Sequence, residues 1–332
     1  MKIRLLLIPS LFLATAAHAS CGSSFCMVNT NWDTQGLAND SGLLVDLRYS
    51  YAKADQWRAG ASKKATEAPG GGTDEEIENK RTINQIATLS LDYSINRQWG
   101  IAVALPFVMR EHSHTFDSSV SGPFTQQAKF SDLGDIRVVG KYKFSLNQEN
   151  SGAGLRFGFK LPTGATNKTM SPPDPREPDT AYALERSSQP GTGSTDAILG
   201  AYYFSNQPGN DTGWFVSTQV QTAIATKEGY RPGQEISLDL GMHHEIAHGL
   251  NLLLQLNGQH KARDTGINAN PASGGYSLGL SPGLNYALDT QTQVYGYAQL
   301  PIVRYLNTDP ANAASGQLSA RWALTAGITR RF

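Results

Sequence analysis

Residues His243–Gly249 read HHEIAHG and contain the spacing His244-Glu245-x-x-His248. On an α-helix this spacing places two imidazoles one turn apart, where they bind zinc while the glutamate acts as general base. The chemistry needs a helix over residues 235–256 and a third ligand. No glutamate follows Glu245 in the chain, which leaves Asp264 as a candidate ligand with no recognisable spacing.

The residues around this motif alternate with period two instead. One face collects Ile236, Leu238, Leu240, Met242, His244 and Ile246, and the other carries Asp239, His243 and Glu245. A helix would scatter both sets around its circumference. Positions 248–249, His-Gly, suit a tight hairpin turn. The sequence therefore predicts two strands joined by a turn, and we interpret the zinc spacing as a chance match with no metal site.

The first nineteen residues resemble a secretory signal. Lys2 and Arg4 precede a short apolar stretch, and Ala17-His18-Ala19 forms a cleavage site, which makes residues 1–19 a signal peptide. The next segment, 20–41, contains the only cysteines, Cys21 and Cys26, and in an oxidising compartment we expect them to form a disulfide. A C-x-x-C-H haem-attachment sequence is absent, and we expect no cofactor.

Composition narrows the class of protein further. Loss of Lys2 and Arg4 with the signal leaves 26 basic against 28 acidic residues, a balance that argues against a nucleic-acid partner. No later run of apolar residues reaches the ~18 that a transmembrane helix requires. An exported, Gly- and polar-rich chain of this kind is either a soluble β protein or an outer-membrane barrel.

The alternation of apolar and polar residues favours an outer-membrane barrel over a soluble β protein. Twelve segments alternate over the ~9–11 residues that a tilted strand needs to cross a membrane. An even number returns both ends of the chain to one side. The segments are 42–52, 82–95, 99–109, 135–144, 154–161, 195–204, 213–225, 235–246, 250–261, 276–288, 292–306 and 318–332.

Connections between these segments alternate in length. Long polar loops are 53–80, 110–131, 162–194 and 262–274, whereas the connections after even-numbered strands are short turns. Long extracellular loops and short periplasmic turns are typical of outer-membrane barrels. We therefore expect an all-β, antiparallel transmembrane β-barrel of about 12 strands over residues 42–332, in the outer membrane of a Gram-negative bacterium.

Two further features agree with this fold. Aromatic residues gather at the predicted periplasmic ends and form a candidate girdle against membrane lipid: Tyr93, Trp99, Tyr142, Phe144, Tyr203, Trp214, Tyr286 and Tyr295. The chain ends in Phe332 on the apolar face of its last strand. A C-terminal aromatic of this kind is expected to engage the barrel-assembly machinery.

Charged residues on the predicted inner faces give the candidate functional site. A charge on the lipid face costs roughly 2–4 kcal/mol near the midplane, so these side chains should face a polar lumen. The predicted pore-lining residues are Asp46, Arg48, Asp92, Arg137, Lys141, Lys143, Arg156, Lys160, Asp239, Glu245 and Arg321. Basic strands opposite an acidic strand would set a transverse field across a pore for small-molecule solutes. Charges that pair with one another in a closed barrel are the alternative.

Three stretches carry a resemblance to a known family: SDLGDIRVVGKYKF, GLRFGFKLPTG and QPGTGSTDAILGAYYF. They resemble the outer-membrane proteins named for the MetA pathway of phenol degradation, over roughly residues 83–332 and most specifically over 131–204. This resemblance implies an outer-membrane barrel that moves small molecules, often aromatic or hydrophobic. The N-terminal stretch CGSSFCMVNTNWDTQG is not part of the pattern.

Other functions remain open at this stage. His112 and His114, near Glu111 and Asp117, could supply the base of an outer-membrane hydrolase. A barrel could also serve as a scaffold for a partner protein. Segment 20–41, with Trp32 and Asp33, could fold into the barrel as a plug, extend into the periplasm or remain a disordered tail.

Overall fold

The computed structural model describes residues 28–37, 42–64, 76–116, 124–144, 150–173, 179, 181–207, 211–313 and 316–332, without the side chains of 76–80. The signal segment 1–19 and the predicted Cys21–Cys26 disulfide lie outside the described residues, as does Asp117. None of the helices in the described ranges is long and apolar enough to cross a membrane.

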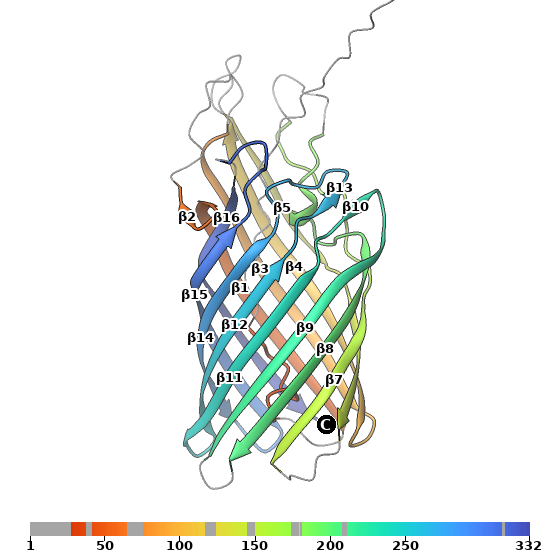
Figure 1. The fold of residues 1–332 in the computed structure, drawn as a ribbon, viewed down its shortest axis with the longest axis vertical. Coiled ribbons are helices and arrows are strands. Elements are labelled where there is room, and N and C mark those ends of the chain that lie inside the picture. Colours follow the sequence, from red (N-terminus) through yellow and green to blue (C-terminus); the bar gives the residue numbers. More distant parts are fainter. Residues whose placement is uncertain are drawn as a thin grey trace, which may run out of the picture.

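Twelve antiparallel strands close into a barrel, as the alternation predicts (Figure 1). Each strand pairs with the next along the barrel, and β16 closes the ring by pairing with β1. The barrel strands are β1 (Gly42–Ala59), β3 (Glu76–Ser94), β4 (Trp99–Phe116), β6 (Arg137–Phe144), β7 (Ser151–Lys160), β8 (Ser194–Gln207), β9 (Thr212–Thr226), β11 (Glu235–Ala247), β12 (Leu250–Lys261), β14 (Gly275–Ala287), β15 (Thr292–Leu306) and β16 (Gln317–Arg331).

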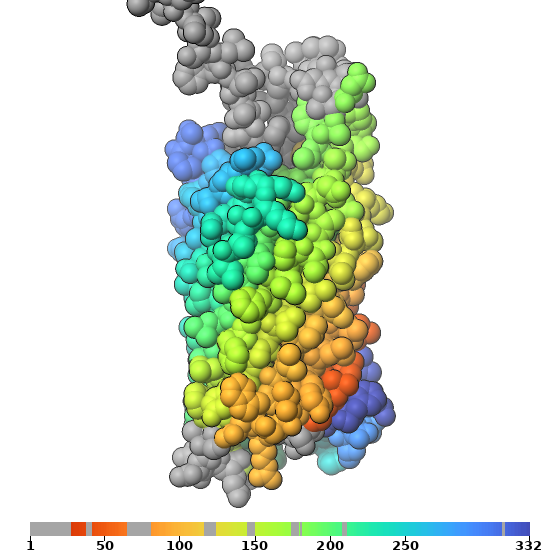
Figure 2. Space-filling view, turned by 90° about the vertical axis from the view of Figure 1, so that its right-hand side faces the viewer, coloured from red at the N-terminus to blue at the C-terminus, as the bar shows by residue number. Residues whose placement is uncertain are grey.

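The outer surface is apolar, as a lipid-facing surface must be. On β11, Leu238, Leu240 and Met242 are 48%, 45% and 46% exposed, while Asp239 between them faces inward. The space-filling view shows a long cylinder (Figure 2). Side chains of the predicted aromatic girdle contact one another at the periplasmic end, where the Trp99 and Tyr142 ring centroids are 4.7 Å apart.

Tyr295 is the exception in that girdle. Its side chain is buried, 5% exposed, and its hydroxyl donates a hydrogen bond of 2.8 Å to Asp46. Tyr295 and Tyr297 alternate with half-buried positions on β15 and share their inward face with Gln299. The prediction that Tyr295 faces lipid was wrong, because it followed residue type at the strand end instead of the period-two pattern.

The predicted loops contain additional strands at the extracellular end. The expected loop 110–131 is the upper part of a hairpin, in which β4 continues to Phe116 and pairs with β5 (Phe124–Leu133). Short strands β2 (Ser62–Lys63), β10 (Tyr230–Arg231) and β13 (Thr265–Gly266) lie in other loops, and β10 pairs with β13. Both faces of β5 carry polar residues, which is why alternation alone does not identify it.

The long connection between β7 and β8 packs against β5. Ala128 of β5, Met170 and Leu184 form a buried apolar cluster, and Ser171 bridges Gln127. At its edge Lys168 donates to Asp132, at 2.7 Å, and this hydrogen bond holds the pKa of Asp132 below its ordinary value. The same connection contains a single 3-10 turn, η1 (Arg186–Ser188).

An anchor cluster fixes both ends of this connection to the barrel. We use that name for Asp135, Lys160, Thr192 and Asp196. The Lys160 ammonium lies 3.2 Å from a carboxylate oxygen of Asp135 and 3.0 Å from one of Asp196. Asp135 also accepts hydrogen bonds from the backbone N–H and the hydroxyl of Thr192, both at 2.9 Å. The three stretches SDLGD, KLPTG and GTGSTD thus meet at one buried group of charges.

We predict that Gly191→Ala loosens this connection. An added Cβ would lie 2.5 Å from the carbonyl oxygen of Gly164, so one of the two crossing backbones has to move. Limited proteolysis of residues 161–194 in the folded protein should become faster. Gly296→Ala is the matched control, because the nearest heavy atom to its Cβ would be the Thr325 oxygen at 3.8 Å. Equal cleavage rates in both variants would contradict the assignment of Gly191 to a required close crossing.

Candidate functional site

The N-terminal segment Val28–Leu37 folds inside the lower half of the barrel (Figure 1). Its backbone forms successive turns, with hydrogen bonds from Thr34 N to Asn31 O at 3.0 Å and from Leu37 N to Trp32 O at 3.0 Å. Asn29 and Gln35 brace it internally, since the Gln35 amide donates to the carbonyl of Asn29 at 2.9 Å. We call residues 28–37 the luminal segment.

One side of the luminal segment is apolar. Trp32 is only 2% exposed, and its ring centroid lies 4.8 Å from that of Tyr295 in an edge-to-face arrangement. Leu253 and Tyr297 complete this buried cluster together with Val28. Leu253 is an inward-facing apolar residue in the run Leu252–Leu254. An apolar residue on both faces of a strand is therefore the sequence signal for an apolar contact surface inside the lumen.

The other side is held by polar and charged contacts. Asn29 donates through its backbone N–H to Gln255 at 3.1 Å and through its amide to Asp239 at 3.2 Å. Arg48 donates to the hydroxyl of Thr30. Near the periplasmic end, Asn206 donates to the carbonyl of Gly36 at 3.1 Å. These contacts reach four barrel strands, so the segment is fixed across the lumen instead of lying along one wall.

A buried ion cluster completes this attachment. The Lys141 ammonium of β6 lies 3.2 Å from a carboxylate oxygen of Asp33, and it also donates to Asp92 of β3. The Lys141 side chain is only 8% exposed. One ammonium therefore connects the luminal segment to two wall strands.

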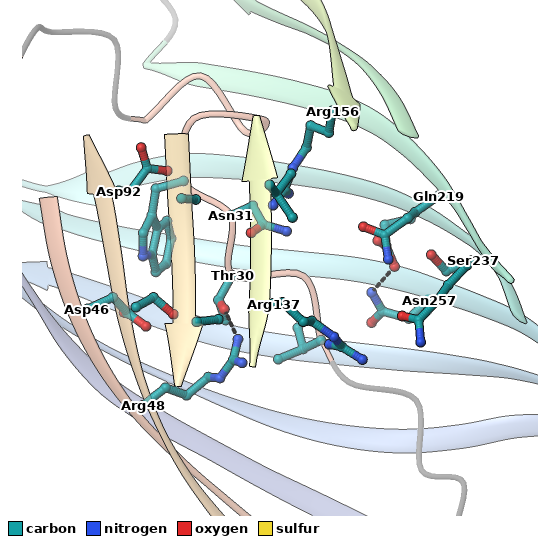
Figure 3. Close-up of a pocket in the computed structure, with 18 of the residues that line it drawn as sticks. Thr30, Asn31, Asp46, Arg48, Asp92, Arg137, Arg156, Gln219, Ser237 and Asn257 are labelled. Atoms are coloured by element: carbon teal, nitrogen blue, oxygen red, sulfur yellow. Dashed lines mark hydrogen bonds between the residues drawn. The ribbon is translucent and has the colours of Figure 1, made fainter. Parts of the chain in front are cut away.

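A cavity of about 250 Å³ lies against the luminal segment (Figure 3). Val28, Thr30, Asn31 and Trp32 form part of its lining, and the rest comes from the barrel wall. Six of the eleven predicted pore-lining residues line it: Asp46, Arg48, Asp92, Arg137, Arg156 and Asp239. Glu235, Gln219 and Gln259 also line it, and no prediction included them.

The five other predicted residues lie elsewhere. Lys141 and Lys160 are buried in the ion clusters described above, and Lys143 stacks over the Phe204 ring at 5.3 Å. Glu245 accepts a hydrogen bond of 2.8 Å from the backbone N–H of Gly249 in the periplasmic turn. Arg321 is largely exposed and pairs with Asp55 at 3.4 Å, away from the cavity, because register shifts between Ala52 and Gln56 interrupt the strict alternation.

Like charges face each other between β6 and β7. Arg137 is directly opposite Lys160, and Lys141 is directly opposite Arg156. Opposite residues of an antiparallel pair have their side chains on the same face, where like charges repel. Two carboxylates lie at Lys160 and two at Lys141, whereas no ion pair involves Arg137 or Arg156 within the described residues. The basic wall therefore has two lysines that are paired with carboxylates and two arginines that form no ion pair in the described part of the chain.

The zinc-spaced motif lies on a strand and a turn. His244 is on β11, where its ring accepts or donates a hydrogen bond of 2.8 Å with Thr212, and Ala247 pairs with Leu250 across the predicted two-residue turn. The helical spacing that would bring two imidazoles together therefore does not arise. Within the described ranges, no group of three His, Cys, Asp or Glu residues is placed to hold a metal ion.

The two histidines considered for hydrolysis lie on the extracellular part of β4. His112 is 2% exposed and shares a hydrogen bond of 2.9 Å with Thr82, which is fully buried. The His114 ring lies 5.3 Å from that of His112 and contacts Gln126 at 3.3 Å. A hydroxyl beside an imidazole is a nucleophile–base arrangement, but here no substrate can reach the Thr82 hydroxyl without unpacking the barrel.

Similarity to a solved outer membrane channel supports the barrel fold, and two further solved structures are similar at lower TM-scores. The chain is similar to the COG4313 outer membrane channel from Pseudomonas putida F1, with 12% identity, coverage of 89% of this chain and 97% of that chain, and a TM-score of 0.62. The transport unit of the autotransporter AIDA-I from Escherichia coli gives 10% identity, coverage of 94% and 95%, and a TM-score of 0.48. The CymD monoaromatic hydrocarbon channel gives 11% identity, coverage of 88% and 89%, and a TM-score of 0.44.

No family model and no curated protein matches the sequence. The resemblance to the MetA-pathway proteins therefore stays a prediction, while the fold is that of a closed outer-membrane barrel. With its apolar exterior and polar interior, the protein belongs in the outer membrane of a Gram-negative bacterium.

We predict that Trp32→Ala releases the luminal segment. Removal of a buried tryptophan costs about 3–5 kcal/mol, which corresponds to at least a hundredfold more frequent opening. Hydrogen exchange measured by mass spectrometry should therefore accelerate in residues 28–37. Trp322→Ala is the control, since Trp322 is 44% exposed and stacks on Tyr51 at 5.7 Å. Unchanged exchange in Trp32→Ala would show that Trp32 does not hold the segment.

Proposed function

We propose that the protein is an outer-membrane channel for small molecules, narrowed by the luminal segment. One observation carries this proposal: the lumen encloses a cavity of about 250 Å³ whose lining is formed by polar and charged wall residues and by the luminal segment. Barrels of eight strands are filled by their own side chains, and wider ones enclose ligand cavities or channels. The lumen of a twelve-stranded barrel is wider, and the wall side chains and the luminal segment of this chain fill it only in part.

The alternative of a closed barrel with self-paired charges explains fewer of the contacts. It accounts for Lys141 and Lys160, which are surrounded by carboxylates. It leaves Arg137 and Arg156 facing the cavity without an ion pair to any described residue. Unpaired charges are costly unless water or a solute reaches them, so they favour a solvated path.

The substrate class follows in part from the resemblance of residues 131–204. That resemblance implies small, often aromatic or hydrophobic compounds. The lining includes apolar groups for such a compound, namely Val28, Trp32, Leu44 and Val139, beside its polar groups.

We further propose that Phe332 presents the C-terminal signal to the barrel-assembly machinery. The backbone N–H and C=O of Phe332 both pair with Leu43, at 2.8 and 3.2 Å.

We predict that deletion of residues 20–37 enlarges the pore. The mature protein refolded into liposomes should let arabinose pass slowly, and the deletion variant should let it pass severalfold faster, because the segment no longer occupies the lumen. Arg97→Gln, a change in an exposed turn, is the control for refolding and insertion. A lack of arabinose permeation through both the mature protein and the deletion variant would exclude the channel.

A further inference from the structure

Two arginines of the luminal wall form no ion pair with any residue that the structure describes. Arg137 and Arg156 both line the cavity, and within the described residues neither is in an ion pair or a side-chain hydrogen bond. The Nε of Arg156 is buried and has no hydrogen-bond partner at all. A buried donor of this kind in a folded protein calls for a solvent molecule or an ion to accept its hydrogen bond.

Their neighbours make this absence of partners unusual. Arg137 faces Lys160 and Arg156 faces Lys141, so each arginine is beside a second positive charge. In both pairs the lysine receives the carboxylates: Asp135 and Asp196 at Lys160, Asp33 and Asp92 at Lys141. The Arg156 charge acts on the carboxylates of Asp33, Asp92 and Asp239, but none of them accepts a hydrogen bond from its guanidinium. A guanidinium with a like charge opposite it and no hydrogen-bond acceptor among the described residues can bind a negative ligand that comes from outside.

The acids that line the same cavity do not fill this role, because protein donors already engage them. Asp239 accepts hydrogen bonds from Asn257 at 2.7 Å and Asn29 at 3.2 Å. Asp46 accepts from the Tyr295 hydroxyl at 2.8 Å, and Glu235 lies 3.9 Å from Lys261. Hydrogen-bond capacity, not the sum of charges, thus separates the two sets: the acids have donors, whereas the arginines have no acceptors.

We propose that Arg137 and Arg156 form a binding site for a small organic anion, a carboxylate with an apolar body. The proposal rests on the proposed channel function and names its substrate class. A guanidinium binds a carboxylate through two parallel hydrogen bonds. The two arginines lie four residues apart along the β6–β7 ladder, or ~13 Å between backbones, so they can bind the anion together or in succession.

Size and lining define the rest of the ligand. A cavity of about 150 Å³ accepts benzene, so about 250 Å³ accommodates a single ring with its carboxylate. Trp32, Leu44 and Val139 provide apolar contact for the body of the molecule. Gln219, Ser237 and Asn257 lie across from Arg137 (Figure 3), and they offer neutral polar groups beside the hydrogen-bonded Asp239.

Binding of three probes of equal shape tests the proposal. Benzoate, benzamide and benzylammonium carry charges of minus one, zero and plus one, and their affinities for the mature protein in a zwitterionic detergent can be measured by titration calorimetry at low salt. We expect saturable binding of benzoate, and at least about tenfold weaker binding of the other two. Equal affinities for the three probes, tighter binding of benzylammonium, or no saturable binding of benzoate would overturn the proposal.

Single substitutions test whether Arg137 and Arg156 form the benzoate-binding site. Arg137→Gln and Arg156→Gln should each weaken benzoate binding about tenfold, whereas Arg97→Gln in an exposed turn should not change it. Both luminal variants should fold, because each arginine lies on the luminal face and forms no ion pair within the described residues, and thermal unfolding of each variant checks this. Benzoate affinity that does not change in either luminal variant would overturn the assignment.

Permeation of a neutral solute separates this proposal from the channel itself. Arabinose flux is measured in the mature protein and in Arg97→Gln, where the proposed site is intact, because arabinose carries no charge for the arginines to bind. Flux of arabinose without preferential benzoate binding overturns the anion site and leaves the channel. Preferential benzoate binding without any flux overturns the channel and leaves the site.

Discussion

The lumen depends on the contact between the Lys141 ammonium and two carboxylates. Asp33 comes from the luminal segment, at 3.2 Å, and Asp92 comes from the neighbouring part of the wall. An ammonium taken out of water costs several kcal/mol unless opposite charges compensate it. Because Asp92 and Asp33 share one cation, the segment is an integral part of the interior, and the buried charge of Asp33 is compensated by an ammonium of the wall.

Compensation of a buried lysine by two carboxylates also stabilises the extracellular half of the barrel. Lys160 is compensated by Asp135 and Asp196, which also fix the ends of the β7–β8 connection. Opposite these two compensated lysines, Arg137 and Arg156 line the cavity and form no ion pair within the described residues. Each pair of opposite basic residues thus has one member that is paired with carboxylates and one that faces the cavity.

Period-two alternation was sufficient to predict the twelve strands and the inward face of most charged residues, because lipid and water select opposite residue types on the two sides of a strand. It failed at Arg321, where register shifts between Ala52 and Gln56 break the alternation. Tyr295 shows that the position of a residue in the period-two pattern predicts the side it faces better than its residue type does. The place of Trp32 was not predictable, since residues 28–37 have no periodicity and their position results from contacts with Tyr295 and Leu253 in distant strands.

A double-mutant cycle at the Lys141 cluster tests this account most directly, with hydrogen exchange of residues 28–37 as the measurement. Lys141→Met should accelerate exchange strongly, because Asp33 and Asp92 then share a buried site without the ammonium that contacts both. The account predicts that adding Asp33→Asn slows exchange again, since the remaining carboxylate no longer faces a like charge. Faster exchange in the double variant than in Lys141→Met alone would contradict the claim that this shared cation holds the segment in the lumen.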